Sequence, residues 1–576
     1  MGDISSNMQV FSWVDYILFS AMLGISTLIG IYFGFFGKKQ KTANDYLLGG
    51  RQMCAIPIAI SLLASKISTT TFLVVPADIY RYGPNYVWLS LATVFVAVIA
   101  HAVYLPVYFK LQLTSMFQYL HLRFDRKLRI LASFFGILSM LVFCPIVIYV
   151  PALAFSQVTG VNVQIIATLT SLICVFYTTV GGLKAVVWTD VFQFIIMIAT
   201  FVIIFIMGLS SVGGFGEIWS KSLTGSRLEV LDFSFDPTLR DSFGALLIGG
   251  TFQWVSFTVA NAGAVQKFLC VPTFKDVKKV IIIYTISMIF LHMFATFMGL
   301  LLYARYWNCD PLASRQIFRL EQLMPKFVME ITGSFTGFPG IFIAAVFSAG
   351  LSSLSACLNA MAGVIYDDFI SPFMRKDITQ EQVGNLLKLI VIVTGIVSTS
   401  LVLALDKVNG IYSLYVGLMA ISTGPLLGIF TLGMLFPSSN SNGTFYGSLL
   451  NMVIIAWISI ENQWYQTQGL YKQYLKPIST EGCNHTFPTL VVHPTDAEQP
   501  FLLYKISFWF YTLIGCVLTV ICGLVISYFT KHDKSPVPKE LLSPIVYPFL
   551  RRKKIKANAV IDYKIGMEME EIPLKQ

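Results

Sequence analysis

The chain has 576 residues, of which 56% are hydrophobic and 12% are charged, and its formal net charge is +10. A soluble protein of this length would carry about 25% charged residues, so the composition excludes an ordinary soluble enzyme and indicates a membrane protein. Basic cytoplasmic loops between membrane spans explain the positive charge better than binding to nucleic acid does.

Apolar runs long enough to cross a bilayer recur along the whole chain. Each spanning helix needs about 20 apolar residues, and we expect an all-α polytopic protein with about 13 transmembrane helices. The first run lacks the basic start of a cleaved signal peptide and is long enough to stay in the membrane. The predicted spans are 12–36, 54–77, 85–108, 128–156, 161–180, 187–210, 243–264, 279–303, 335–363, 386–406, 411–436, 445–461 and 505–529.

The loops between these spans alternate between basic and less basic. Because basic loops stay in the cytoplasm, we expect the N-terminus outside and the C-terminus inside. The basic set comprises Lys38, Lys39, Lys41, Lys110, Arg123, Arg126, Lys127, Lys267, Lys275, Lys278, Lys279, Arg375, Lys376 and the run 551–554.

Two long loops, 211–242 and 462–504, then lie outside. The second contains Asn484 in an Asn-His-Thr sequon, which predicts glycosylation. Cys309 and Cys483 also fall in outer loops, where a disulfide between them can form, although two free thiols are the simpler expectation. The tail from 530 to 576 is polar and is expected to be flexible and cytoplasmic.

The second span has a polar centre. Residues 64–71 read ASKISTTT and place Lys66 at membrane depth. A lysine and five hydroxyls are costly in lipid, so this segment must face protein, water or a ligand. Irregular, polar backbone inside the membrane is typical of a transporter binding site.

The seventh span has a similar character. It carries Gly249-Gly250-Thr251 near its start and Asn261-Ala262-Gly263 near its end, five spans after the second. Interrupted helices at matching positions of two halves indicate an inverted repeat with a central site.

Ser352 and Ser353 are adjacent hydroxyls inside the ninth span, in the run AGLSSLS at 349–355. A serine in a membrane helix commonly bonds its own preceding turn or packs against a neighbouring helix. The functional alternative is a sodium site, because hard cations prefer oxygen ligands. An unwound second span would add the carbonyls of Ala64 and Ile67 to such a site.

At residues 177–190 the chain reads YTTVGGLKAVVWTD, which resembles the signature of the sodium/solute symporter family. The resemblance extends over roughly residues 45–436 and is closest to the branch of sodium-coupled monocarboxylate, multivitamin and iodide transporters. Its further motifs are YLPV at 104–107, LTS at 113–115, IYVPALA at 148–154, QVTG at 157–160, VQ at 265–266 and GPLLG at 424–428.

The resemblance implies a LeuT-like core of two inverted five-helix repeats, at 54–210 and 243–436. Residues 1–53 would form an outer helix and a cytoplasmic loop, 211–242 an extracellular loop, and 437–529 the C-terminal helices. The resemblance assigns the sodium ligands to the carbonyls of Ala64, Ile67 and Ala349 and the hydroxyls of Ser352 and Ser353. It further assigns the substrate or second-ion site to Ser68, Thr71, Tyr149 and Trp254, and the sodium exit to Asp190. The alternative role for Asp190 is a cap and dipole partner at the start of the sixth predicted span.

The chain departs from this branch at Lys66, where an uncharged residue is usual, and at Ala262, where the branch has glutamine. Lys66 either snorkels to a cytoplasmic water cavity or acts as a fixed cation beside the site. In the second case it pairs with a substrate carboxylate or replaces a sodium ion. Thr71 matches the monocarboxylate relatives rather than the iodide carriers.

We therefore expect a sodium-coupled secondary active symporter in the plasma membrane. It would import a small organic anion, monocarboxylate-like or vitamin-like, by alternating access, with Na⁺ as the coupling ion. The alternative is a sodium-dependent sensor or channel on the same fold. An enzyme is not expected, because none of the six histidines stands in a recognisable catalytic motif.

Overall fold

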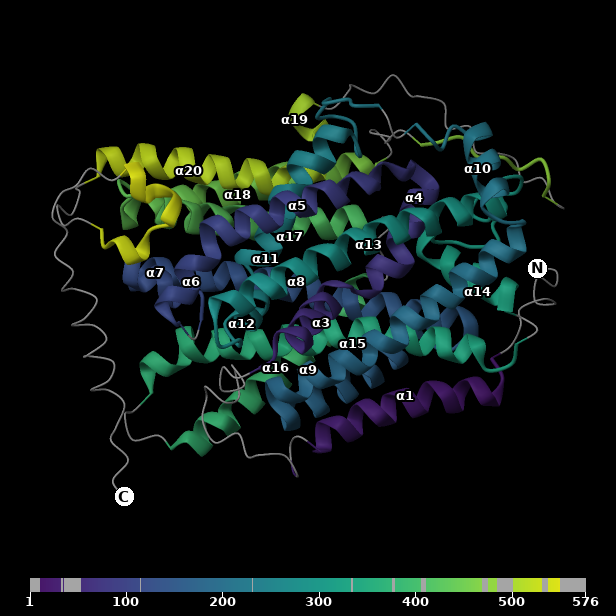
Figure 1. Cartoon of the computed structure of the whole chain (residues 1–576), viewed down its shortest axis with the longest axis horizontal. Coiled ribbons are helices and arrows are strands. Elements are labelled where there is room, and N and C mark those ends of the chain that lie inside the picture. The colour runs from purple at the N-terminus through teal and green to yellow at the C-terminus, as the bar shows by residue number, and fades with distance from the viewer. Residues whose placement is uncertain are drawn as a thin grey trace.

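The computed structural model describes residues 11–32, 35, 53–113, 115–229, 232–332, 335–374, 379–405, 411–468, 475–483, 501–530 and 537–549. Asn484 and the basic run 551–554 lie outside these ranges. Within the ranges every regular element is a helix. The longer helices run side by side along the long axis of the molecule (Figure 1). In that view α20 ends at the left near α6 and α7, and α10 and α14 lie at the right.

Eleven described helices or helix runs are long and apolar enough to cross a membrane, and the bent pair Ala55–Lys66 and Thr70–Tyr82 makes up to twelve. Ala245–Val259 is a shorter apolar helix in the seventh predicted span. Helix therefore occupies all thirteen predicted ranges, although the count of thirteen full spans is not reproduced. The helices of six residues or more are α1 (Trp13–Ile31), α3 (Ala55–Lys66), α4 (Val75–Tyr82), α5 (Leu89–Ile99), α6 (Leu105–Leu111), α7 (Gln118–Arg123), α8 (Arg126–Thr159), α9 (Val163–Val212), α10 (Phe215–Thr224), α11 (Gly250–Val259), α12 (Ala262–Phe268), α13 (Phe274–Tyr306), α14 (Leu323–Thr332), α15 (Phe338–Ile365), α16 (Gln380–Leu405), α17 (Ile411–Leu435), α18 (Ser441–Thr467), α20 (Tyr511–Phe529) and η12 (Pro544–Phe549).

The predicted spans 161–180 and 187–210 join without a loop in the single helix α9. The sequence between them, GGLKAV at 181–186, contains two glycines but no proline, so the helical hydrogen bonds can continue through it. Two candidate spans, Val163–Gly181 and Ala185–Val212, lie within this helix, so both predicted spans are confirmed although no loop separates them.

Small residues let α1 lie close to α9 and α15. A Cβ atom on Gly30 would lie 2.6 Å from Cβ of Tyr177, and one on Gly340 would lie 2.5 Å from the backbone of Asp15. The amide of Gly340 also donates to Oδ1 of Asp15 at 2.8 Å. Close backbone approach through small residues is the usual way in which membrane helices associate.

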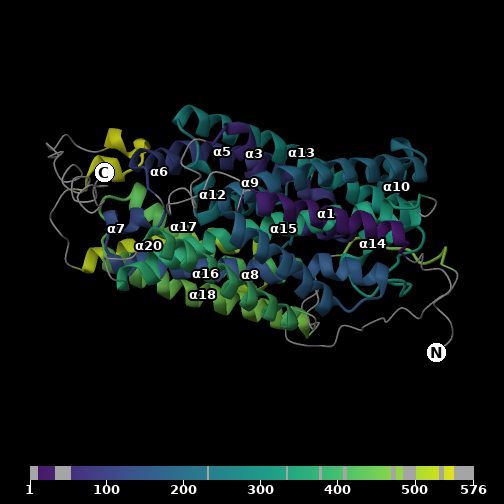
Figure 2. The ribbon, with the colours of Figure 1, turned by 90° about the horizontal axis from the view of Figure 1, so that it is seen from below.

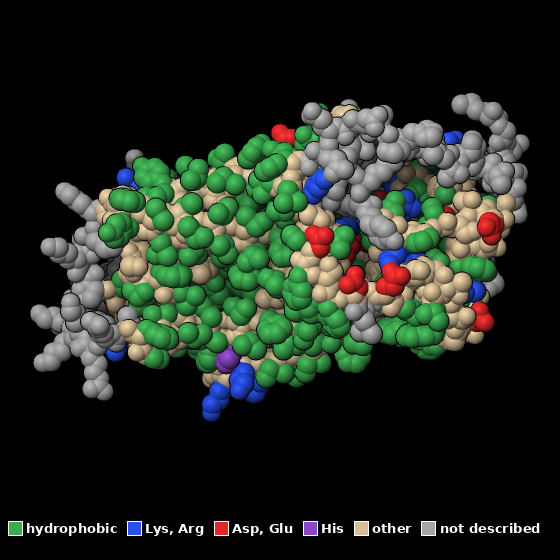
Figure 3. Space-filling view, turned by 90° about the horizontal axis from the view of Figure 1, so that it is seen from above, with side chains coloured by type: hydrophobic (Ala, Val, Ile, Leu, Met, Phe, Trp, Pro, Cys, Tyr) green, Lys and Arg blue, Asp and Glu red, His purple; other side chains and the backbone are tan. Residues whose placement is uncertain are grey.

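The outer surface suits lipid. Seen from below, α5 and α13 lie along one flank and α16 and α18 along the opposite flank (Figure 2). From above, hydrophobic side chains cover most of the left and centre of the molecule, and most charged side chains gather toward the right end (Figure 3). An apolar band with charges beyond it is the pattern expected of a membrane-spanning bundle.

Cys309 and Cys483 form a disulfide, so the expectation of two free thiols was wrong. Backbone hydrogen bonds hold the two loops together: Gly482 N donates to Asn308 O at 3.0 Å, and Asp310 N donates to Ser479 O at 2.9 Å. These bonds bring together cysteines that are 174 residues apart in the sequence. A disulfide is typical of an oxidising compartment, which agrees with the predicted external placement of both loops.

The disulfide sets the number of reactive thiols. Of nine cysteines, two are paired and seven are free, so the denatured, non-reduced protein should take up seven maleimide labels by mass spectrometry. Reduction before labelling should expose all nine. The Cys483→Ser variant should take up the same number of labels before and after reduction. Nine labels on the non-reduced wild type would show that the disulfide is absent.

Candidate functional site

The second predicted span is a broken helix. α3 ends at Lys66, and the axis turns by 60° before helix resumes at Thr70. Ile67 has extended backbone angles, φ −79° and ψ 91°. Carbonyl groups in the last turn of α3 therefore lack their usual helical partners. Such groups are tolerated at membrane depth only where they face protein or a cavity, and Ala64 and Ile67 are each 1% exposed.

Side chains at the break bond to nearby groups and to α15. The Ser68 and Thr70 hydroxyls lie 2.5 Å apart, and the Thr71 amide donates to Ser68 O at 3.0 Å. The Thr69 hydroxyl donates to Val346 O of α15 at 3.4 Å. A Cβ atom on Gly350 would lie 3.2 Å from Thr69 Oγ1, so a glycine permits this close approach. The break is thereby held against the middle of α15.

Ser353 of α15 reaches the broken end of α3, where its hydroxyl donates to Ser65 O at 3.4 Å. Ala349, Ser352 and Ser353 are each 1% exposed. The predicted sodium ligands are therefore all buried, and they lie on two elements that contact each other. Of these ligands only Ser353 lines a described cavity.

Asp190 of α9 links this region to two further elements. Its carboxylate accepts hydrogen bonds from Ser352 Oγ and Ser61 Oγ, each at 2.6 Å. The Lys267 ammonium of α12 lies 3.1 Å from Asp190 Oδ2 and also donates to Ser61 O at 2.8 Å. Asp190 is fully buried and Lys267 is 2% exposed. We call Asp190, Ser61, Lys267 and Ser352 the Asp190 cluster.

The sequence placed Lys267 in a basic cytoplasmic loop, and this interpretation was wrong. Lys267 lies in α12, beyond the second helix break, and its side chain turns inward to the carboxylate. Neither Lys267 nor Ser61 carried a sequence signal for this role. The lysine was placed in the basic set that continues at Lys275, and Ser61 is a single hydroxyl in the apolar first half of the second predicted span.

The seventh predicted span is also broken, between α11 and α12. Asn261 is the N-cap of α12, and its side chain accepts a hydrogen bond from Ala264 N at 3.0 Å. The freed carbonyl of Val259 accepts from the Tyr108 hydroxyl at 3.0 Å. The two breaks therefore have different partners. Asn261 and Tyr108 bond the backbone at the second break, whereas Thr69 and Ser353 link the first break to α15.

Two adjoining cavities lie between the breaks and share Ser65, Lys66, Phe143, Asn261 and Met419. The α12-side cavity continues past Ala264, Ser353 and Cys357. The α11-side cavity continues past Ser68, Thr71 and Trp254 and has a volume of about 90 Å³. This volume is below the roughly 300–1,000 Å³ of drug-sized ligand sites, so only a small solute would fit without movement of the surrounding helices.

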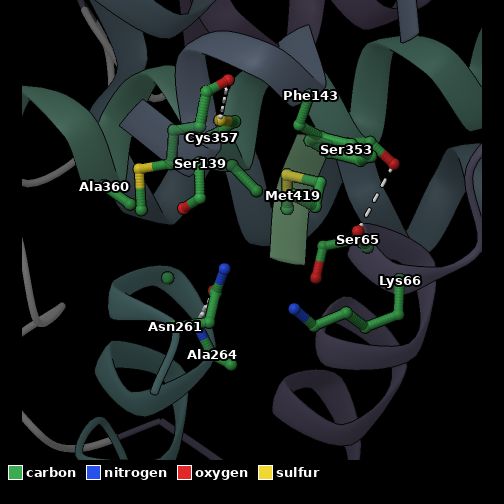
Figure 4. A pocket seen from close by; sticks show the side chains of 13 residues that line it. Ser65, Lys66, Ser139, Phe143, Asn261, Ala264, Ser353, Cys357, Ala360 and Met419 are labelled. Carbon is green, nitrogen blue, oxygen red and sulfur yellow. Dashed lines mark hydrogen bonds between the residues drawn. The ribbon is translucent and has the colours of Figure 1, made fainter. Parts of the chain in front are cut away.

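Lys66 stands where the two cavities meet. Figure 4 shows its side chain extending into the α12-side cavity toward Asn261, with Ser353 and Ser65 joined behind it. Its ammonium nitrogen lies 5.7 Å from the centre of the Phe257 ring. The amino group of Lys66 thus points into the space between the broken helices.

Of the predicted substrate residues, Lys66, Ser68, Thr71 and Trp254 line the α11-side cavity together. Tyr149 does not line either cavity; it is fully buried in α8, with the Arg319 guanidinium 5.9 Å from its ring centre. Trp254 packs edge-on against His292 at 5.6 Å, so its indole forms a fixed wall of the cavity.

The oxygen atoms at the first break are hydroxyls and carbonyls. No group of three or more His, Cys, Asp or Glu side chains among the described residues is arranged to hold a metal. Neutral oxygen donors beside one carboxylate suit a monovalent hard cation such as Na⁺ better than a transition metal.

Comparison with known proteins shows the family to which the chain belongs. A family model described as Sodium:solute symporter family matches residues 46–451. The chain is 35% identical to sodium-coupled monocarboxylate transporter 1 of Xenopus laevis over 552 residues, which is 93% of this chain and 88% of that protein. It is 32% identical to the human sodium/iodide cotransporter over 584 residues, 97% of this chain and 90% of that protein.

A solved structure has a similar fold. It is described as the substrate-bound outward-open state of a Na⁺-coupled sialic acid symporter that reveals a novel Na⁺-site. The TM-score is 0.74 and the identity is 24%, with 92% of this chain and all of that chain covered.

The N-cap of α12 should hold the second break in place. Replacing Asn261 with alanine removes the acceptor for Ala264 N and should destabilise the protein by about 1 kcal/mol, whereas serine can still cap the helix. We therefore expect Asn261→Ala, but not Asn261→Ser, to lower the temperature of thermal unfolding in detergent. Equal unfolding temperatures for the two variants would show that the cap does not support this break.

Proposed function

Because this chain belongs to the sodium:solute symporter family, we propose that it imports a small organic anion across the plasma membrane by alternating access. The protein is a multi-pass membrane transporter that couples solute movement to Na⁺, and it is not an enzyme. The observation that carries the choice of an anion is the Lys66 ammonium, which projects into the cavity between the two broken helices.

The proposed sodium site consists of the carbonyls of Ala64, Ile67 and Ala349 and the hydroxyls of Ser352 and Ser353. Ser352 donates its proton to Asp190, so the lone pairs of its oxygen are left for a cation. Ser353 donates to Ser65 O, so the same holds for its oxygen. Burial of both serines strengthens their attraction for a cation, because the interior is less polarisable than water.

The proposed anion site is the α11-side cavity. No described carboxylate lies within ion-pair distance of Lys66, whereas Lys267 has Asp190 as its partner. A charged group inside the membrane normally has a counter-ion, and the carboxylate of a substrate would supply one for Lys66. Ser68 and Thr71 would offer hydroxyl donors, and Trp254 an apolar wall. The names of the relatives, a monocarboxylate transporter and an iodide cotransporter, also indicate anions.

Sodium and anion would then bind to opposite sides of the same helix break. Sodium at the α3–α15 contact would hold the break in one shape and so complete the cavity wall formed by Ser68 and Thr71. The inverted repeats at 54–210 and 243–436 would rock around this centre. The N-terminus would lie outside and the C-terminus in the cytoplasm. Each net positive charge carried inward would gain about 2.3 kcal/mol per 100 mV of membrane potential.

The serine pair should determine the sodium requirement. In Ser352→Ala and Ser353→Ala variants we expect the sodium concentration for half-maximal uptake to rise by about 10- to 100-fold, as for other groups that support metal sites. Uptake of lactate, biotin, pantothenate and iodide would be measured, with choline as the cationic control. Ser348→Ala is the matched control, because Ser348 is equally buried on α15 but bonds Ala344 O one turn away. Unchanged sodium dependence in both variants would refute the proposed site.

Lys66 should determine anion affinity. Removing one partner of a buried charge pair costs about 2–5 kcal/mol, so Lys66→Met should raise the KM for the transported carboxylate at least about 30-fold. Lys66→Arg should retain most of the affinity, because it keeps the charge. The amide of the same substrate, which lacks the charge, should compete equally weakly against wild type and Lys66→Met. A wild-type KM in Lys66→Met would rule out pairing between Lys66 and the carboxylate.

A further inference from the structure

The Asp190 cluster joins four helices through one carboxylate. Ser61 comes from α3, Ser352 from α15 and Lys267 from α12, while Asp190 itself belongs to α9. Among the described residues, Lys267 is the only cation within ion-pair distance of this carboxylate. The cluster adjoins the proposed sodium site because both contain Ser352.

The Lys267 ammonium has the surroundings of a bound cation. It contacts one carboxylate oxygen, Asp190 Oδ2 at 3.1 Å, and one carbonyl oxygen, Ser61 O at 2.8 Å. An anionic oxygen and a carbonyl oxygen are also the ligands that a hard metal cation prefers. The lysine supplies the same charge as Na⁺, but it is covalently held and cannot be released.

We propose that the Lys267 ammonium is a tethered cation that fills a cation position at Asp190, and that it thereby limits the number of sodium ions the protein binds. This inference rests on the proposed sodium site at Ser352. With Lys267 present, the Asp190–Lys267 pair is neutral, and Asp190 only orients the Ser352 hydroxyl. Without the lysine charge, a buried carboxylate would remain beside the sodium site and would attract another cation.

A purely structural ion pair would behave differently. Breaking a buried pair by removing one partner leaves an uncompensated charge and destabilises a protein whatever salt is present, whereas removing both charges is often tolerated. If Lys267 is a tethered cation, sodium should replace its charge specifically. The number of sodium ions bound then separates the two roles, because a structural role does not change it.

The test is equilibrium binding of radioactive sodium to purified full-length protein in detergent, at saturating sodium and without substrate. Lys267→Met should bind one more sodium ion per protein than wild type. Lys267→Arg should bind the wild-type number, because it keeps the cation. The double variant Lys267→Met/Asp190→Asn should also bind the wild-type number, because it lacks the carboxylate. Lys279→Met is the matched control, since this exposed lysine pairs with Asp276 at 3.2 Å outside the cluster.

An equal number of sodium ions bound by Lys267→Met and wild type would overturn the inference, and so would an additional ion in the double variant. If Asp190 captures a proton in place of sodium, Lys267→Met and wild type would bind equal numbers of sodium ions, and the inference would be overturned. If Lys267→Met is poorly recovered, its yield should improve when membranes are solubilised in sodium rather than potassium; equal yields in the two salts would also overturn the inference. Failure of wild type to bind sodium saturably would refute the proposed function instead.

Discussion

Unpaired backbone carbonyls at membrane depth are the constraint on which the rest of the structure depends. A helix that breaks inside the bilayer leaves such groups without water to bond, so the break must turn toward protein, a cavity or an ion. The break after α3 turns toward α15, and the break before α12 is closed by Asn261 and Tyr108. In the proposed sodium site the first break would keep carbonyls for a cation, whereas the second break would mainly shape the cavity.

The charged side chains in the centre of the bundle also differ in their surroundings. The centre of the bundle holds Lys66, Lys267 and Asp190, of which Lys267 and Asp190 form a pair. The amino group of Lys66 faces the cavity, where the proposed anion would bind. Ser352 and Ser353 link the Asp190–Lys267 pair to the first helix break. The Ser352 hydroxyl contacts the Asp190 carboxylate, and the neighbouring Ser353 contacts the end of α3. Sodium and anion would therefore affect each other through α3 and α15 rather than by direct contact.

Much of this organisation could be predicted from the chain alone. Apolar runs of sufficient length located the helices, and the polar run around Lys66 identified the broken span, because both signals are local. The Asp190 cluster could not be found in this way. Its bonds join residues 77, 129 and 162 positions apart, and a lysine at the end of an apolar run looks the same whether it turns inward or outward. The Cys309–Cys483 disulfide and the continuity of α9 were missed because they depend on how loops and neighbouring helices meet in space.

The central claim is that sodium binds where the broken end of α3 meets α15. Hydrogen–deuterium exchange of the purified protein, compared in sodium and in potassium, tests it most directly because it reports backbone mobility at the break itself. The account predicts that sodium slows amide exchange in residues 64–71 and 349–353, and that the Ser352→Ala/Ser353→Ala variant shows no such difference. Equal exchange in the two salts, or protection confined to other helices, would contradict the account.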